Sequence, residues 1–92
     1  MIVRISGEGQ FDVPDGHLHE LNRLDDDLTK AVDAADEGGF KTALDALLTS
    51  VRSAGQELPA DWIGPSDLVL PSPDATIHEV REVLGDEGLI PG

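Results

Sequence analysis

The chain has 92 residues and no cysteine, so residues 1–92 are expected to form one small domain that apolar packing holds without disulfides or thiolate metal sites. Lysine and arginine total 6, aspartate and glutamate total 19, and the formal net charge is −13. This composition excludes a basic surface for nucleic acid, and an anionic membrane surface would repel the chain. The acidity leaves two compatible interpretations: solubility or salt adaptation, or an acidic face that docks on a basic partner.

The N-terminal segment predicts a β-hairpin. Val3 and Ile5 alternate with polar or outward positions, and Phe11 and Val13 repeat this pattern. The linking Ser6-Gly7-Glu8-Gly9 contains two glycines, which tolerate positive φ angles. Pro14 should end the second strand because it has no N–H to donate to the sheet.

No signal or membrane-spanning pattern is found in the sequence. Met1 leads directly into the strand pattern, without a basic region followed by an apolar one, and no apolar run approaches the ~20 residues that span a bilayer. We therefore expect a cytoplasmic protein that does not insert directly into a membrane.

Residues 16–54 predict two amphipathic helices joined by a very short break at residues 36–39, and hence an antiparallel helical hairpin. Asp15 is the expected N-cap of the first helix, and Gly55 the expected left-handed stop of the second. Apolar residues recur every three or four positions in two stripes: Leu18, Leu21, Leu24, Leu28, Val32 and Ala35, then Phe40, Ala43, Leu44, Leu47, Leu48, Val51 and Ala54.

The last third of the chain predicts a connector, a strand and a helix. Residues 55–66 hold two prolines, two glycines and the only tryptophan, with one helical turn expected around residues 59–62. Residues 67–70 predict a short third strand, because the prolines that follow prevent its extension. Thr76 and Glu79 have the spacing of a capping box for a final helix that should end at Gly85.

The predicted fold class is therefore α+β: an N-terminal β-hairpin, a central antiparallel helical hairpin, a short third strand and a C-terminal capped helix in a single small domain. The helical hairpin should cover one face of a three-stranded sheet. Its two apolar stripes can exceed what three short strands cover, and any uncovered remainder would form an interaction groove.

No residue pattern predicts catalysis, a cofactor site or a metal site. His17 and His19 lie about 200° apart around a helix, so they cannot share an ion. The run of residues 25–27 lacks the spacing of a calcium loop and is expected on a solvated helix face. Glu79 and Glu82 lie one turn apart without the apolar surroundings that would raise a pKa for acid–base catalysis. We therefore expect a protein that is not an enzyme.

Two features are candidates for partner binding. Asp26, Asp27 and Asp33 lie on the polar side of the first predicted helix and could dock on a basic partner. Trp62, in the connector, has two readings that stay open at this point. It is either a lid over the core or a partly exposed anchor for a partner, because tryptophan is enriched among binding hot spots.

The sequence resembles the PspA-associated protein family, PspAA, from end to end. The segments that carry the resemblance are MIVRISGEGQF at the start, LNRLD with Asp36-Glu37 in the middle, PSDLVLP at residues 65–71 and LGDEGLIPG at the end. The two terminal segments are the distinctive ones, and no functional residues are carried over from the family.

The resemblance implies a non-enzymatic adaptor or regulator associated with a phage-shock-protein-A-like partner, a coiled-coil protein of the membrane-stress system that coats bilayers. Such a partner would recruit the chain to the inner face of the membrane. The alternative is an acidic mimic of nucleic acid that occupies the basic site of a regulator. The oligomeric state stays open.

Overall fold

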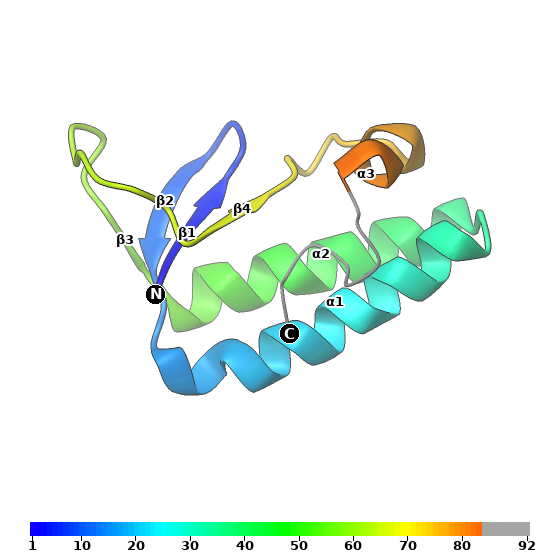
Figure 1. Cartoon of the computed structure of the whole chain (residues 1–92), viewed down its shortest axis with the longest axis horizontal. Coiled ribbons are helices and arrows are strands. Elements are labelled where there is room, and N and C mark those ends of the chain that lie inside the picture. Colours follow the sequence, from blue (N-terminus) through cyan, green and yellow to red (C-terminus); the bar gives the residue numbers. More distant parts are fainter. Residues whose placement is uncertain (84–92) are drawn as a thin grey trace.

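The computed structural model describes residues 1–83. In it the chain folds into two layers, and one of them is a four-stranded mixed sheet (Figure 1). The strands are β1 (Ile2–Ile5), β2 (Gly9–Asp12), β3 (Gln56–Glu57) and β4 (Leu68–Leu70). Their order in the sheet is β3-β2-β1-β4, with β1 antiparallel to β2, β2 antiparallel to β3, and β1 parallel to β4.

The predicted N-terminal hairpin is confirmed. Val3 lies opposite Phe11, and Ile5 lies opposite Gly9. Both loop glycines have positive φ, +82° at Gly7 and +143° at Gly9, which glycine adopts without a Cβ penalty. Strand alternation turns Val3, Ile5 and Phe11 toward the core, where all three are buried.

The predicted strand near residue 67 is also confirmed, because β4 pairs with β1 and places Leu70 beside Ile5. The sheet nevertheless has four strands where three were predicted. The additional strand, β3, contains only Gln56 and Glu57 and has no apolar pattern to reveal it. It forms because the chain leaves the second long helix directly along the edge of β2.

The second layer is an antiparallel pair of helices, α1 (Leu18–Asp33) and α2 (Glu37–Ala54), which covers one face of the sheet (Figure 1). This confirms the helical hairpin predicted over residues 16–54. The start of α1 differs from the prediction. A 3₁₀ turn, Asp15–His17, precedes it, and His17 occupies the cap position, where its side chain does not cap the helix. The Asp15 carboxylate instead accepts a hydrogen bond from the Met1 amino group at 3.2 Å.

The break between the helices is shorter than predicted. The Asp36 carboxylate accepts a hydrogen bond from the Gly39 amide at 3.1 Å, so α2 begins at Glu37 and takes in three residues of the expected break, Glu37, Gly38 and Gly39. Ala35 carries the left-handed conformation between the helices, with φ of 53°.

Gly55 does not act as a left-handed stop, which corrects the prediction for the end of α2. Its φ of −93° and ψ of 160° are extended, because the residue leads into β3. Glycine is required there for a different reason. A Cβ atom at this position would lie 2.8 Å from the Val51 carbonyl oxygen and 2.9 Å from a Val13 methyl group.

A third helix, α3 (Ile77–Val83), completes the core. The Thr76 hydroxyl accepts a hydrogen bond from the Glu79 amide at 3.2 Å, which confirms Thr76 as the cap, but within residues 1–83 the return bond of a capping box, from the Thr76 amide to the Glu79 carboxylate, is not formed. The predicted end at Gly85 lies outside the described residues. Buried Ala75 and Val80 join the same core as the two helical stripes, and Arg81 donates a hydrogen bond to the Val32 carbonyl at 2.9 Å.

The apolar stripes of α1 and α2 thus pack against the sheet toward one end of the helical pair and against α3 toward the other end, on the same face (Figure 1). Their surplus over the sheet is covered by the chain itself, and among residues 1–83 no large apolar side chain of either stripe is exposed. The buried apolar core comprises Val3, Ile5, Phe11, Val13, Leu21, Leu24, Leu28, Val32, Phe40, Leu44, Leu47, Leu48, Val51, Leu70, Ala75 and Val80.

Candidate partner-binding surfaces

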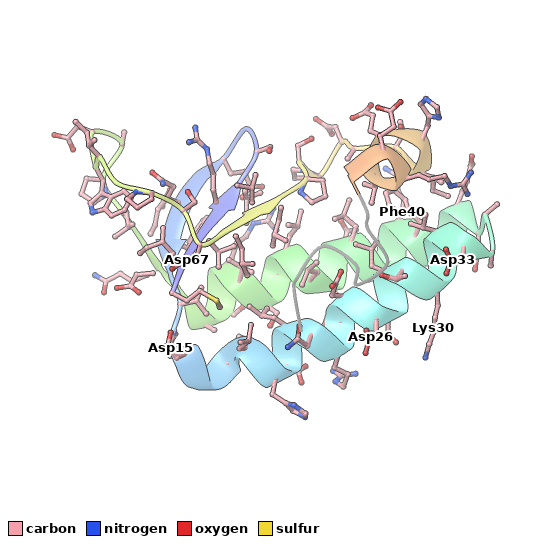
Figure 2. All side chains as sticks on the ribbon, in the orientation of Figure 1. Asp15, Asp26, Lys30, Asp33, Phe40 and Asp67 are labelled. Atoms are coloured by element: carbon pink, nitrogen blue, oxygen red, sulfur yellow. The ribbon has the colours of Figure 1, made fainter. Side chains whose placement is uncertain are left out.

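The three candidate aspartates on α1 are all exposed. Asp26 and Asp33 are two helical turns apart and share one side of the helix, with Lys30 between them. Figure 2 shows Asp26 and Lys30 projecting from α1 away from the sheet. Asp26 and Lys30 therefore lie on the outer side of the helical layer.

Basic side chains lie between the acidic side chains on the exposed surface of α1. Arg23 lies 4.0 Å from Asp27 and 2.6 Å from Glu20, and it holds the pKa of the Glu20 carboxyl below its usual value through a hydrogen bond. Lys30 separates the other two aspartates. The exposed side of α1 is therefore a mixed charged face, and it does not present the unbroken negative row of a nucleic-acid backbone.

The run of residues 25–27 is divided by the helix. Asp25 is only 2% exposed, whereas the next two aspartates lie in solvent. The prediction of a solvated face is therefore wrong for Asp25. Its position four residues after Leu21 and three before Leu28 turns it toward the buried stripe of α1.

The connector between β3 and β4 is fastened to the sheet at both ends. The Leu58 amide donates to the Gln10 carbonyl at 2.9 Å, and the Gln10 side chain donates to the Ser66 hydroxyl at 2.9 Å. The Asp67 amide donates to the Ile2 carbonyl at 2.8 Å. Between these points the chain protrudes as a loop at the upper left of Figure 1, away from the helical layer.

Trp62 lies in this loop and is partly buried. Its amide donates to the Pro59 carbonyl at 3.0 Å, which closes a turn where one helical turn was expected. The indole ring covers Gly64 so closely that a Cβ atom there would lie 2.5 Å from the ring. The next residue, Ile63, is 94% exposed.

Ile63 was not among the candidates from sequence. The available signal was an isoleucine that belongs to neither helical stripe, within a connector rich in proline and glycine. Such a residue has no predicted core partner, but sequence alone does not show whether a neighbouring segment covers it.

The structure does not bring Trp62 and the α1 aspartates together. The connector lies on the sheet side of the molecule, whereas Asp26 points outward from the helical side (Figures 1 and 2). A single straight helix of a partner cannot touch both surfaces at once. The two sets of candidates therefore belong to two separate surfaces.

Two clefts flank the sheet. One, of about 390 Å³, lies between β4 and α3 and is lined largely by apolar atoms of Val69, Leu70, Pro71 and Ala75. The other, of about 290 Å³, lies between the β1–β2 hairpin and the connector, and its lining includes Arg4, Gln10, Glu57 and Pro59.

The histidines occupy separate places. His17 Nε2 lies 2.7 Å from the Ser50 hydroxyl, and His78 Nε2 lies 3.4 Å from the Glu82 carboxylate. His19 is exposed on α1. Within residues 1–83, no three histidine, aspartate or glutamate side chains are grouped in a way that could hold a metal ion.

None of the helices in residues 1–83 combines the length and the apolar character needed to cross a bilayer. Among family models, that of the PspA-associated protein, PspAA, matches residues 1–92. No curated protein and no solved structure matches the chain.

Proposed function

Because this chain belongs to the PspA-associated protein family, we propose that it is a non-enzymatic adaptor or regulator that binds a phage-shock-protein-A-like coiled-coil protein directly. The observation that carries the proposal is the family match over the whole chain, since the family is described by its association with PspA. In this role the chain works in the cytoplasm, and its partner recruits it to the inner face of the membrane.

The charge of the chain supports a basic docking surface on the partner. A net charge of −13 on 92 residues attracts basic proteins from beyond contact distance. Asp26 and Asp33 on α1 are exposed to solvent and contribute to this field. Such exposed charges mainly accelerate encounter and add little to the lifetime of a complex.

The experiment is a titration of the purified partner, from the organism that encodes this chain, against the immobilised full chain at low and high salt. We expect a saturable complex whose association slows as salt rises, because exposed charges are screened beyond about 8–10 Å near physiological ionic strength. Absence of any complex at either salt would refute direct binding.

A triple variant tests the contribution of α1. Replacing Asp26, Asp27 and Asp33 with asparagine should slow association more than it speeds dissociation. The matched control changes the same net charge elsewhere, through Asp45→Asn, Glu79→Gln and Glu82→Gln. Equal slowing in both variants would assign the effect to net charge and not to α1.

A further inference from the structure

Ile63 is the most exposed large apolar residue in the described part of the chain, and it has no role in the core. Among residues 1–83, only Ile63 and Val69 are large apolar side chains with high exposure, at 94% and 57%. Single exposed apolar residues are ordinary on protein surfaces. Ile63, however, directly follows the only tryptophan of the chain, and both belong to the segment between β3 and β4 that protrudes from the sheet (Figure 1).

This loop, residues 60–64, is held in place before any partner arrives. The hydrogen bonds of Leu58 and Ser66 to Gln10 fix the connector on either side of it. Within the connector, the Trp62 amide bonds to the Pro59 carbonyl and the indole ring lies over Gly64. An ordered loop loses little conformational entropy on binding, so more of the contact energy is kept as affinity.

Acidic residues lie before, within and after the loop along the chain. Asp61 lies within the 60–64 loop, Glu57 lies before it on β3, and Asp67 lies after it, immediately before β4, and all three are exposed. Glu57 also lines the 290 Å³ cleft between the connector and the β1–β2 hairpin. The loop therefore combines exposed apolar surface with carboxylates close by in the chain, which complements a surface that places lysines or arginines beside apolar residues.

We propose that the 60–64 loop is the anchor by which this chain holds its coiled-coil partner, and that it packs on a helix whose apolar stripe is bordered by basic side chains. The inference rests on the proposed function and adds the contact surface. Trp62 and Ile63 supply the buried apolar contact, and Glu57 and Asp61 pair with the basic border.

The loop fits this role better than α1 does. The exposed side of α1 carries aspartates interrupted by Arg23 and Lys30, and none of its large apolar side chains is exposed. Hot spots of protein interfaces are enriched in tryptophan and lie in apolar contacts surrounded by polar rims. The α1 charges thus guide the encounter, and the loop determines how long the complex lasts.

Trp62 also reports on the proposed contact, because it is the only tryptophan in the chain. The full chain is titrated with purified partner, and the emission of the partner alone at the same concentrations is subtracted. We expect Trp62 emission to shift to shorter wavelength on binding, and acrylamide to quench it less.

Dissociation kinetics test the neighbouring residue. Ile63→Ser should raise the dissociation rate about tenfold with a small effect on association, the size expected for a residue near the centre of an interface. Val69→Ser is the matched control, because it removes an exposed apolar side chain from β4 outside the loop. Melting temperatures of both variants should stay near wild type, since neither residue is buried.

The outcomes separate the two proposals. If the wild-type chain binds the partner and Ile63→Ser dissociates at the wild-type rate, the anchor is refuted and the proposed function stands. Equal effects of Ile63→Ser and Val69→Ser also refute it. If the wild-type chain forms no complex, both proposals fail together.

The inference would also be overturned if the loop were shown to bind either of two other surfaces, a membrane or a second copy of the chain. A shift of Trp62 emission with vesicles of phosphatidylethanolamine and phosphatidylglycerol in equal parts, without partner and absent in Ile63→Ser, would make the loop a membrane contact. A concentration-dependent dimer of the chain alone, seen by sedimentation and lost in Ile63→Ser, would assign the loop to a second copy.

Discussion

Glu8, in the turn between β1 and β2, forms a two-point ion pair with Arg52 in the last turn of α2, and Arg52 Nε lies 2.9 Å from a carboxylate oxygen of Glu8. The two residues are 44 positions apart in sequence. The pair joins the sheet layer to the helical layer. Its hydrogen bonds hold the pKa of the Glu8 carboxyl below its usual value and raise the pKa of Arg52.

We expect this pair to make stability depend on acid pH. A lowered carboxyl pKa stabilises the fold above the unfolded-state value of 4.5, and this contribution is lost as pH falls through the folded-state pKa. Because both side chains are partly exposed, Glu8→Gln should cost at most about 1 kcal/mol at neutral pH.

The measurement is urea unfolding of wild type and Glu8→Gln from neutral pH downward. The difference should shrink in acid, and the Glu8→Gln/Arg52→Gln double variant should resemble either single variant. A difference that stays constant with pH would show that Glu8 acts through packing and not through its charge.

Ala35→Gly should stabilise the protein, which is unusual for such a change. Ala35 has a left-handed φ of 53°. This conformation is strained for any residue that carries a Cβ atom, and glycine adopts it without that strain. We expect a gain of about 0.5 kcal/mol after the larger entropy loss of glycine on folding is included. Ala34→Gly is the control and should lower stability, because Ala34, the residue that follows α1, has an ordinary right-handed φ of −84°. Thermal unfolding compares both, and a loss in both variants would contradict the prediction.

Gly55→Ala should destabilise the fold by about 1–3 kcal/mol. The added methyl group would meet the Val51 carbonyl oxygen at 2.8 Å and a Val13 methyl at 2.9 Å, where α2 passes into β3. Gly16→Ala is the control, since a Cβ atom there would meet nothing within 4 Å. Chemical denaturation of both variants decides, and equal stability would mean that the α2–β3 junction adapts without cost.

Leu47→Asp should abolish cooperative unfolding. Leu47 is fully buried at the centre of α2, and an unpaired charge there costs several kcal/mol, a large part of the roughly 5–10 kcal/mol expected for so small a domain. Ala46→Asp places the same charge on the exposed side of α2 and should unfold like wild type. Circular dichroism during heating separates them, and a wild-type melt of Leu47→Asp would place the stripe in solvent.

Local patterns predicted the elements of this fold well, because helix and strand periodicity depends on neighbouring residues. The stripe from Leu21 to Val32 is buried as its spacing predicts. The prediction failed where a side chain found a distant partner. Asp15 binds the amino group of Met1 instead of capping α1, and β3 exists only because α2 ends beside β2.

The candidate binding surfaces were also predicted only in part from the sequence. The composition indicated an acidic protein, and the presence of a single tryptophan made Trp62 a candidate. The exposure of Ile63 depends on the absence of a covering segment among residues 1–83, and the charge of α1 depends on where Arg23 and Lys30 project. These are relations between distant groups or around a helix surface, which a linear pattern does not contain.

By itself, the sequence determined the helical hairpin, the N-terminal β-hairpin, the capped last helix and the family, because each is encoded in short-range spacing or in segments that resemble the family. The tertiary structure alone decided that β4 joins β1 in parallel, that α3 covers the surplus of the helical stripes, and that Trp62 and the α1 aspartates lie on separate surfaces. The physical reason is that burial and pairing across the chain are settled by which layers pack together, and many distant pairings satisfy the same local pattern.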